Sequence, residues 1–267
     1  MPAETQIKIE IRDLTMAYGS FVVMRDISVN INRGEIFIIM GGSGCGKSTL
    51  LRHMVGLKEP AKGDVFYDGV PFWKSDEEVR MGKLRSFGVL FQSGALWSSM
   101  TLAENIGLVL GEYTEFPLAE IRAIARLKLA LVGLKGFEDY YPAEISGGMC
   151  KRAGLARALA LDPDILFFDE PSAGLDPISS RNLDELILQL RDTLGATFVV
   201  VTHELASIFT IADNSVFLDP NTRMMRAHGN PRELLKNSTD PAVREFLTRG
   251  EASAKSITAK PSNVPVL

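Results

Sequence analysis

A glycine-rich stretch near the start of the chain constrains its fold more than any other feature of the sequence. Residues 41–48 read GGSGCGKS and fit the pattern G-x-x-x-x-G-K-[ST]. The continuously apolar run IFIIM, residues 36–40, comes directly before it, and residues 49–52 open a helix after it. This order of strand, glycine loop and helix predicts a phosphate-binding loop at the edge of an α/β sheet.

Each part of this loop has a physical role in binding phosphate. Glycines allow the backbone to wrap closely around an anion, so that successive N–H groups point at its oxygens. The Lys47 ammonium can reach β- and γ-phosphates, and the Ser48 hydroxyl can bind Mg²⁺. The predicted nucleotide-binding residues here are Gly41, Gly42, Ser43, Gly44, Cys45, Gly46, Lys47, Ser48 and Thr49. The loop alone leaves kinase, GTPase and ATPase open.

Two further apolar runs, residues 165–168 and 197–201, predict buried strands that end in polar residues. Asp169 and Glu170 follow the first run, and His203 follows the second. Because ligands bind at the carboxyl ends of parallel strands, we expect these side chains to meet the phosphate loop. Asp169 is then a Mg²⁺ ligand, Glu170 the base for an attacking water, and His203 a γ-phosphate contact. The alternatives are a solvated acidic turn and a structural histidine.

The rest of the chain is organised around this predicted core. Alternating Ile7, Ile9 and Ile11, and the segment VFY before Asp68-Gly69, predict antiparallel strands within residues 5–70. Residues 93–160 have helical periodicity, with a helix starting near Pro117, and predict a helical subdomain inserted into the core. Residues 251–267 hold no aromatic residue and indicate a disordered tail or an arm that orders on a neighbouring subunit.

Composition excludes several other classes of protein. The 267 residues carry a net charge of −4, so there is no basic excess for nucleic-acid binding. Two cysteines exclude a disulfide scaffold and indicate a reducing compartment. We expect neither a signal peptide nor a membrane span, because the N-terminus lacks the required pattern and the apolar runs are short. These features predict a cytoplasmic protein.

With the segment ISGGM, residues 145–149, upstream of ILFFDEP, the motif set resembles the ATP-binding cassette (ABC) ATPase family over about residues 5–235. The resemblance implies that Tyr18 stacks on adenine and that Gln92, in VLFQ, links Mg²⁺ and water to the helical subdomain. Ser146, Gly147 and Gly148 match the signature that caps ATP on the opposite subunit. Asp176 belongs to a segment that resembles the D-loop, and His203 resembles the switch histidine.

The resemblance also implies the fold class and the assembly. The expected fold is α/β, a P-loop NTPase (ABC ATPase) core over residues 5–250 with an N-terminal antiparallel β subdomain and the inserted helical subdomain. Two copies would form a homodimer and sandwich ATP and Mg²⁺ head to tail. The implied catalytic residues are Lys47, Gln92, Glu170 and His203, and the implied Mg²⁺ ligands are Ser48, Gln92 and Asp169.

The segment SGGMCKRAGLARAL resembles more narrowly the ATPase subunits of lipid transporters that work with MCE-domain proteins, of the Mla (maintenance of lipid asymmetry) type. Met149 stands where the wider family has Gln. Segments 93–97 and 240–247 are similar to the same group. This resemblance implies phospholipid transport between membranes and outer-membrane lipid asymmetry. The implied partners are an integral membrane permease (MlaE-like), an MCE-domain protein (MlaD-like) and a STAS-domain protein (MlaB-like), at the cytoplasmic face of the inner membrane.

The resemblance further implies a site for a coupling helix of the permease. Leu96, Trp97, Met100 and Leu102 are expected to supply an apolar groove lip, or else to pack inside the helical subdomain.

Other functions remain as alternatives. The nearest is the same ATPase serving an importer of a polar solute. A non-transport ABC protein of translation or DNA repair is disfavoured, because there is one cassette and no sustained heptad pattern. A P-loop kinase or GTPase is disfavoured because neither explains residues 146–149 or His203.

Overall fold

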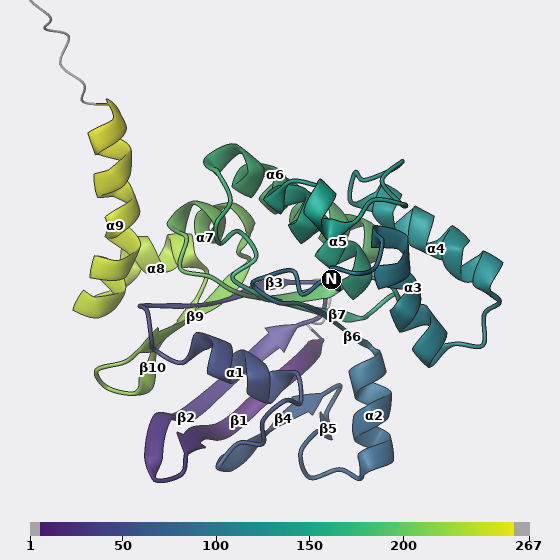
Figure 1. The fold of residues 1–267 in the computed structure, drawn as a ribbon. Coiled ribbons are helices and arrows are strands. Elements are labelled where there is room, and N and C mark those ends of the chain that lie inside the picture. Colours follow the sequence, from purple (N-terminus) through teal and green to yellow (C-terminus); the bar gives the residue numbers. More distant parts are fainter. Residues whose placement is uncertain (1–5, 259–267) are drawn as a thin grey trace, which may run out of the picture.

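A six-stranded sheet forms the centre of the molecule in a computed structural model that describes residues 6–258 (Figure 1). The strand order is β10-β9-β3-β8-β7-β6, and all neighbours are parallel except β9 and β10. Five carboxyl ends, those of β9, β3, β8, β7 and β6, therefore lie along one edge. The strands are β3 (Ile36–Gly41), β6 (Phe87–Leu90), β7 (Ile165–Asp169), β8 (Thr197–Val201), β9 (Asn214–Asp219) and β10 (Met224–Gly229).

A second, antiparallel sheet lies below the first in Figure 1. Its order is β2-β1-β4-β5, with β1 (Ile7–Tyr18), β2 (Phe21–Asn32), β4 (Lys62–Tyr67) and β5 (Val70–Pro71). Residues 68 and 69 form the tight turn between β4 and β5, with both residues at positive φ. The antiparallel strands and the turn expected from the sequence are therefore confirmed.

The helices begin where side chains can satisfy their free N–H groups. Thr101 and Glu104 form a reciprocal capping box at α3, and the Asp176 carboxylate accepts hydrogen bonds at α6. Pro117 precedes α4, as its position in the sequence indicated. The helices are α1 (Lys47–Met54), α2 (Glu77–Arg85), α3 (Leu102–Tyr113), α4 (Leu118–Leu131), α5 (Gly147–Ala158), α6 (Pro177–Leu194), α7 (Leu205–Ile211), α8 (Pro231–Asn237) and α9 (Pro241–Thr258), with a 3₁₀ turn at Pro142–Glu144.

Strand β3 is apolar on both faces because each face packs into a separate core. Ile36, Ile38 and Met40 belong to the core shared with α3 to α7. Phe37 and Ile39 belong to the core shared with α1 and the antiparallel sheet. Burial on both faces explains the unbroken apolar run that precedes the phosphate loop.

Strand β6 is an element that the sequence analysis did not assign. It is four residues long and pairs in parallel with β7, with Phe87 opposite Ile165 and Leu90 opposite Phe168. This pairing places Gln92, two residues beyond the strand, at the same edge as the phosphate loop. The expected helical section 93–160 contains helices α3, α4 and α5, which lie above and to the right of β6 in Figure 1.

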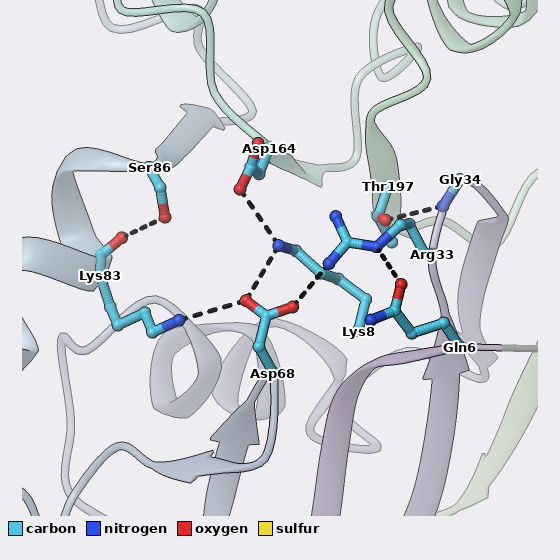
Figure 2. Close-up of polar contacts among 9 residues, drawn as sticks. All are labelled: Gln6, Lys8, Arg33, Gly34, Asp68, Lys83, Ser86, Asp164 and Thr197. Atoms are coloured by element: carbon cyan, nitrogen blue, oxygen red, sulfur yellow. Dashed lines mark hydrogen bonds and ion pairs between the residues drawn. The ribbon is translucent and has the colours of Figure 1, made fainter.

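A buried lysine ties the two sheets together (Figure 2). The Lys8 ammonium pairs with Asp68 Oδ2 at 3.0 Å and with Asp164 Oδ2 at 3.1 Å, just before β7. Arg33 and Lys83 also pair with Asp68. Burial alone would raise the pKa of Asp68, but hydrogen bonds from Lys8 and Lys83 hold that pKa below its ordinary value.

Two expectations concern the ends of the chain and the membrane. The tail or arm expected at residues 251–267 starts within α9, whose residues 251–258 are helical, and residues 259–267 lie outside the described part. Within residues 6–258, no helix has the length and apolar character needed to cross a membrane.

Candidate active site

The carboxyl edge of the central sheet brings together most of the residues that the sequence singled out. The phosphate loop follows β3, and Gln92 follows β6. Asp169 ends β7, Glu170 comes directly after it, and His203 follows β8. They surround two pockets of about 580 and 570 Å³, and Gln92 lines both. The larger pocket is of the size that small-molecule and cofactor sites usually have.

The phosphate loop forms one wall of the larger pocket. Gly46 has a φ of 94°, and a Cβ there would lie 2.8 Å from Val23 Cγ1, so this position requires glycine. The buried Lys47 ammonium donates to the carbonyl oxygens of Gly41 and Gly42, both at 3.1 Å. The loop residues that line the pocket are Ser43, Gly44, Gly46, Lys47, Ser48 and Thr49.

Cys45 differs from its neighbours in the loop. Its side chain is buried and packs in the core beneath the loop. Burial raises the pKa of the Cys45 thiol, which keeps it in the neutral form. Cys45 therefore faces the protein interior, and its backbone is the part available to a phosphate group.

Two side chains with oxygen atoms meet at the position expected for Mg²⁺. The Ser48 hydroxyl donates to Asp169 Oδ1 at 2.8 Å, although the two residues are 121 positions apart. Asp169 and Gln92 both line the smaller pocket. Hydroxyl, carboxylate and amide oxygens are ligands that Mg²⁺ prefers, so these residues fit the ion.

Glu170 and His203 form a polar pair opposite the phosphate loop. His203 Nδ1 lies 2.8 Å from Glu170 Oε1, and both residues line the larger pocket. Glu170 Oε2 is buried and has no hydrogen-bond partner among the described residues. Glu170 also has a φ of 49°, a conformation that costs a non-glycine residue about 1–2 kcal/mol. The main-chain N–H of Glu170 holds it there by donating to the Val201 carbonyl at 2.9 Å.

Tyr18 also lines the larger pocket, at the tip of the β1–β2 hairpin. Its ring is exposed, and the Lys58 ammonium sits 3.9 Å from the ring centroid, in a cation–π contact. Phe21, its cross-strand partner, and Val23 also line the pocket. The sequence analysis missed both residues; their place beside Tyr18 in a hairpin was the one signal available.

Seven predicted nucleotide-binding residues do not line either pocket of their own chain. Three of them, Gly41, Gly42 and Cys45, belong to the phosphate loop, and the other four lie outside it. Ser146 caps α5 by accepting a hydrogen bond from Met149 N at 3.3 Å, and Asp176 caps α6. Gly147 and Gly148 form the first turn of α5. None of these lines either pocket around the phosphate loop of the same chain.

The segment expected to form an apolar groove lip is divided between surface and core. Trp97 is 59% exposed, and Leu96 and Met100 are half-buried. Leu102 is fully buried in the core, so its assignment to the groove lip was wrong. Its place in the first turn of α3, just after the Thr101 cap, turns its side chain inward.

A phosphate loop after a buried parallel strand, with an acidic strand end beside it, defines a P-loop nucleotide-binding protein. Residues 24–173 match the ABC transporter family, and the chain belongs to that family.

Two groups of curated relatives cover most of the chain. The Escherichia coli intermembrane phospholipid transport system ATP-binding protein MlaF is 40% identical over 90% of this chain and 88% of its own length. A probable ribonucleotide transport ATP-binding protein, mkl, of Mycobacterium tuberculosis is 42% identical over 90% of this chain. The chain spans 66% of the length of that mycobacterial relative.

Solved structures of ABC cassettes share the fold. CbiO1 from Clostridium perfringens, part of the ABC transporter complex cbiONQ, has a TM-score of 0.80 at 26% identity, covering 96% of this chain and all of that one. The ATP-binding cassette MJ0796, in a dimeric post-hydrolysis state bound to ADP and Pi, has a TM-score of 0.75 at 28% identity and covers 83% and 98%. The expected fold class is confirmed.

Proposed function

We propose that this chain is the ATP-hydrolysing subunit of an ABC transporter that moves phospholipid between membranes. The convergence of Lys47, Ser48, Asp169 and the Glu170–His203 pair at one sheet edge carries the hydrolytic part of this proposal. The lipid part rests on the likeness to MlaF over nearly the whole chain.

The residues of the site divide the work of hydrolysis. Lys47 and the loop N–H groups bind the β- and γ-phosphates and offset their charge. Ser48, Asp169 and Gln92 would hold Mg²⁺, which when bound supplies positive charge to the phosphate oxygens. Glu170 accepts a proton from water as its oxygen attacks the γ-phosphorus, and the bond to the bridging oxygen breaks to give ADP and phosphate. His203 orients the Glu170 carboxylate through Oε1.

We infer a homodimer in which each ATP lies between two copies. The placement of Ser146, Gly147 and Gly148 away from the phosphate loop of their own chain supports this arrangement, as does the dimeric MJ0796 cassette. The N-terminus of α5, with the N–H groups of Gly147 and Gly148, then faces the γ-phosphate of the partner's nucleotide. Loss of that phosphate removes the charge that bridges the two copies and loosens the dimer.

The proposed assembly docks at the cytoplasmic face of the inner membrane. The dimer would bind an integral permease of the MlaE kind, and the exposed Trp97 would lie at the surface of the dimer that contacts the permease. An MCE-domain protein (MlaD-like) would bind the lipid, and a STAS-domain protein (MlaB-like) would join the ATPase. The likeness to MlaF over nearly the whole chain supports this set of partners.

A second candidate function is that the same ATPase subunit powers the transport of a polar solute. The 42% identity to the probable ribonucleotide transport protein favours it. The two functions differ in the membrane and substrate-binding subunits, not in the chemistry of this chain.

The test is to isolate the complex from its native membrane in mild detergent, and to identify its subunits and bound lipid by mass spectrometry. An MCE-domain subunit with enriched phospholipid is the expected result. A solute-binding protein without enriched lipid would replace the lipid proposal by the polar-solute one. A complex that binds ATP but does not hydrolyse it would refute the hydrolytic part.

A further inference from the structure

Helix α5 is attached along one face to the loop that carries Gln92. The Lys151 ammonium donates to the carbonyl oxygen of Gln92. One turn and a half further on, the Arg157 guanidinium donates to the carbonyl oxygens of Ala95 and, at 3.3 Å, of Gly94. Residues 151, 154 and 157 recur every three positions and therefore share one side of the helix.

Gly154, between these two side chains, brings the helix backbone against the loop. A Cβ at this position would lie 2.9 Å from the Gly94 carbonyl oxygen and 2.9 Å from Leu90 Cδ1. The loop itself is closed by a hydrogen bond of 2.8 Å from Gly94 N to the Phe91 carbonyl. The helix and the loop thus pack as one unit with almost no space between their main chains.

Of the contacts between helix α5 and the loop, the one made by Lys151 involves a residue that lines the nucleotide pockets. Its side chain is 7% exposed, and Gln92, whose carbonyl it holds, lines both pockets. Among residues 6–258, the Gln92 carbonyl oxygen is the hydrogen-bond acceptor that the Lys151 ammonium contacts. Burial lowers the pKa of Lys151, and the charge of Glu170 acts in the opposite direction. A buried cation costs stability unless it is paired, and the contact that offsets this cost for Lys151 is its hydrogen bond to the Gln92 carbonyl.

We propose that Lys151 is a positioning residue for ATP hydrolysis, which fixes the Gln92 main chain to helix α5 and so joins the two nucleotide sites of the dimer. This inference rests on the proposed function. Helix α5 begins with Gly147, next to the Ser146 cap, and these residues face the partner's nucleotide in the head-to-tail arrangement. Gln92 faces the nucleotide of its own chain. Helix α5 therefore connects the partner's nucleotide, at the helix N-terminus, with Gln92 at the nucleotide of its own chain.

The decisive variant is Lys151→Met, studied in the complex isolated from native membranes. Because a hydrogen bond to a charged donor contributes strongly, kcat should fall about ten-fold. The dissociation constant for ATP, measured with a fluorescent analogue on the full chain, should stay unchanged, since Lys47 and its loop are intact. Lys151→Arg should recover most of the lost rate, because the guanidinium is also a permanent donor.

Lys128→Met is the matched control. Lys128 is a buried lysine of the same helical section, 4% exposed, and pairs with Asp162. Neither residue lines the two pockets. Its removal should lower thermal stability without changing kcat in the folded fraction. This control separates the loss of any buried lysine from the loss of the contact with Gln92.

A second measurement does not depend on activity. Hydrogen exchange of the amides at residues 91–96 should speed up in Lys151→Met and stay unchanged in Lys128→Met, because only the first loses the attachment of the loop. Wild-type kcat with wild-type exchange in Lys151→Met would overturn the proposal, as would weakened ATP binding with unchanged kcat, or no recovery in Lys151→Arg. If Lys151→Met does not fold, Lys151→Leu, which also lacks a donor, takes its place with the same readouts. If the wild-type complex does not hydrolyse ATP, the proposed function fails, and the exchange experiment still decides whether Lys151 holds the loop.

Discussion

Asp184 is a buried acid on α6 whose ionisation should destabilise the folded chain. Its side chain is 5% exposed and lies near Ser207 on α7. Burial raises the pKa of Asp184 from 3.8 to about 6; the Ser207 hydroxyl offsets part of this increase, and the like charge of Glu204 adds to it. The substitution Asp184→Asn keeps the shape of the side chain and removes the charge.

The pKa difference sets both the size and the pH window of the effect. In the unfolded chain Asp184 ionises near pH 3.8, whereas in the folded chain it stays protonated to about pH 6. The folded state therefore binds the proton more tightly, and its stability falls as the pH rises between these two values. Above pH 6 the penalty is complete, about 3 kcal/mol in the free energy of unfolding. Asp184→Asn should remove it, with little gain near pH 4 and the full gain at pH 8.

Urea unfolding of the full chain, at several values between pH 4 and pH 8, measures this difference. Asp192→Asn is the control, because Asp192 lies on the same helix with its side chain 67% exposed. That control should change the free energy of unfolding by less than about 0.5 kcal/mol at every pH. A gain for Asp184→Asn that does not grow with pH, or a loss at pH 8, would refute the reasoning.

Three further predictions concern the site and the sheets. Glu170→Gln should bind ATP but hydrolyse it about 100-fold more slowly, and form a dimer that persists on size-exclusion chromatography with ATP; wild-type turnover in the complex would exclude Glu170 as the base. Lys47→Ala should bind a fluorescent ATP analogue about ten-fold more weakly, and unchanged affinity would argue against the phosphate cradle. Lys8→Met should lower the free energy of unfolding by about 1–2 kcal/mol. This loss is smaller than for a fully buried pair, because water reaches Asp68 and Asp164. An unchanged urea midpoint would contradict the role of the ion pairs.

The sequence was informative about the central sheet because its signals are local. The run IFIIM and the loop that follows it occupy adjacent positions, and short-range chemistry fixes their strand, turn and helix. Strand β6 was not assigned because it is four residues long and its sequence, FGVL, has no polar residues to alternate with apolar ones. Leu102 was misplaced because its inward direction depends on the cap at Thr101 and on the packing of α3 against α4.

The sequence by itself determined the class of the chain: a phosphate loop, an acidic strand end, a polar histidine at a third strand end and a signature segment, in one order. These are stretches of a few residues whose chemistry requires particular residue types. Only the tertiary structure decided which side chains meet across the chain. The contact of Lys151 with the Gln92 carbonyl, the Lys58 ammonium over Tyr18 and the pairing of Lys8 with Asp164 join residues up to 156 positions apart. Such contacts depend on the order of strands in the sheets and on the packing of helices, which no short segment of sequence specifies.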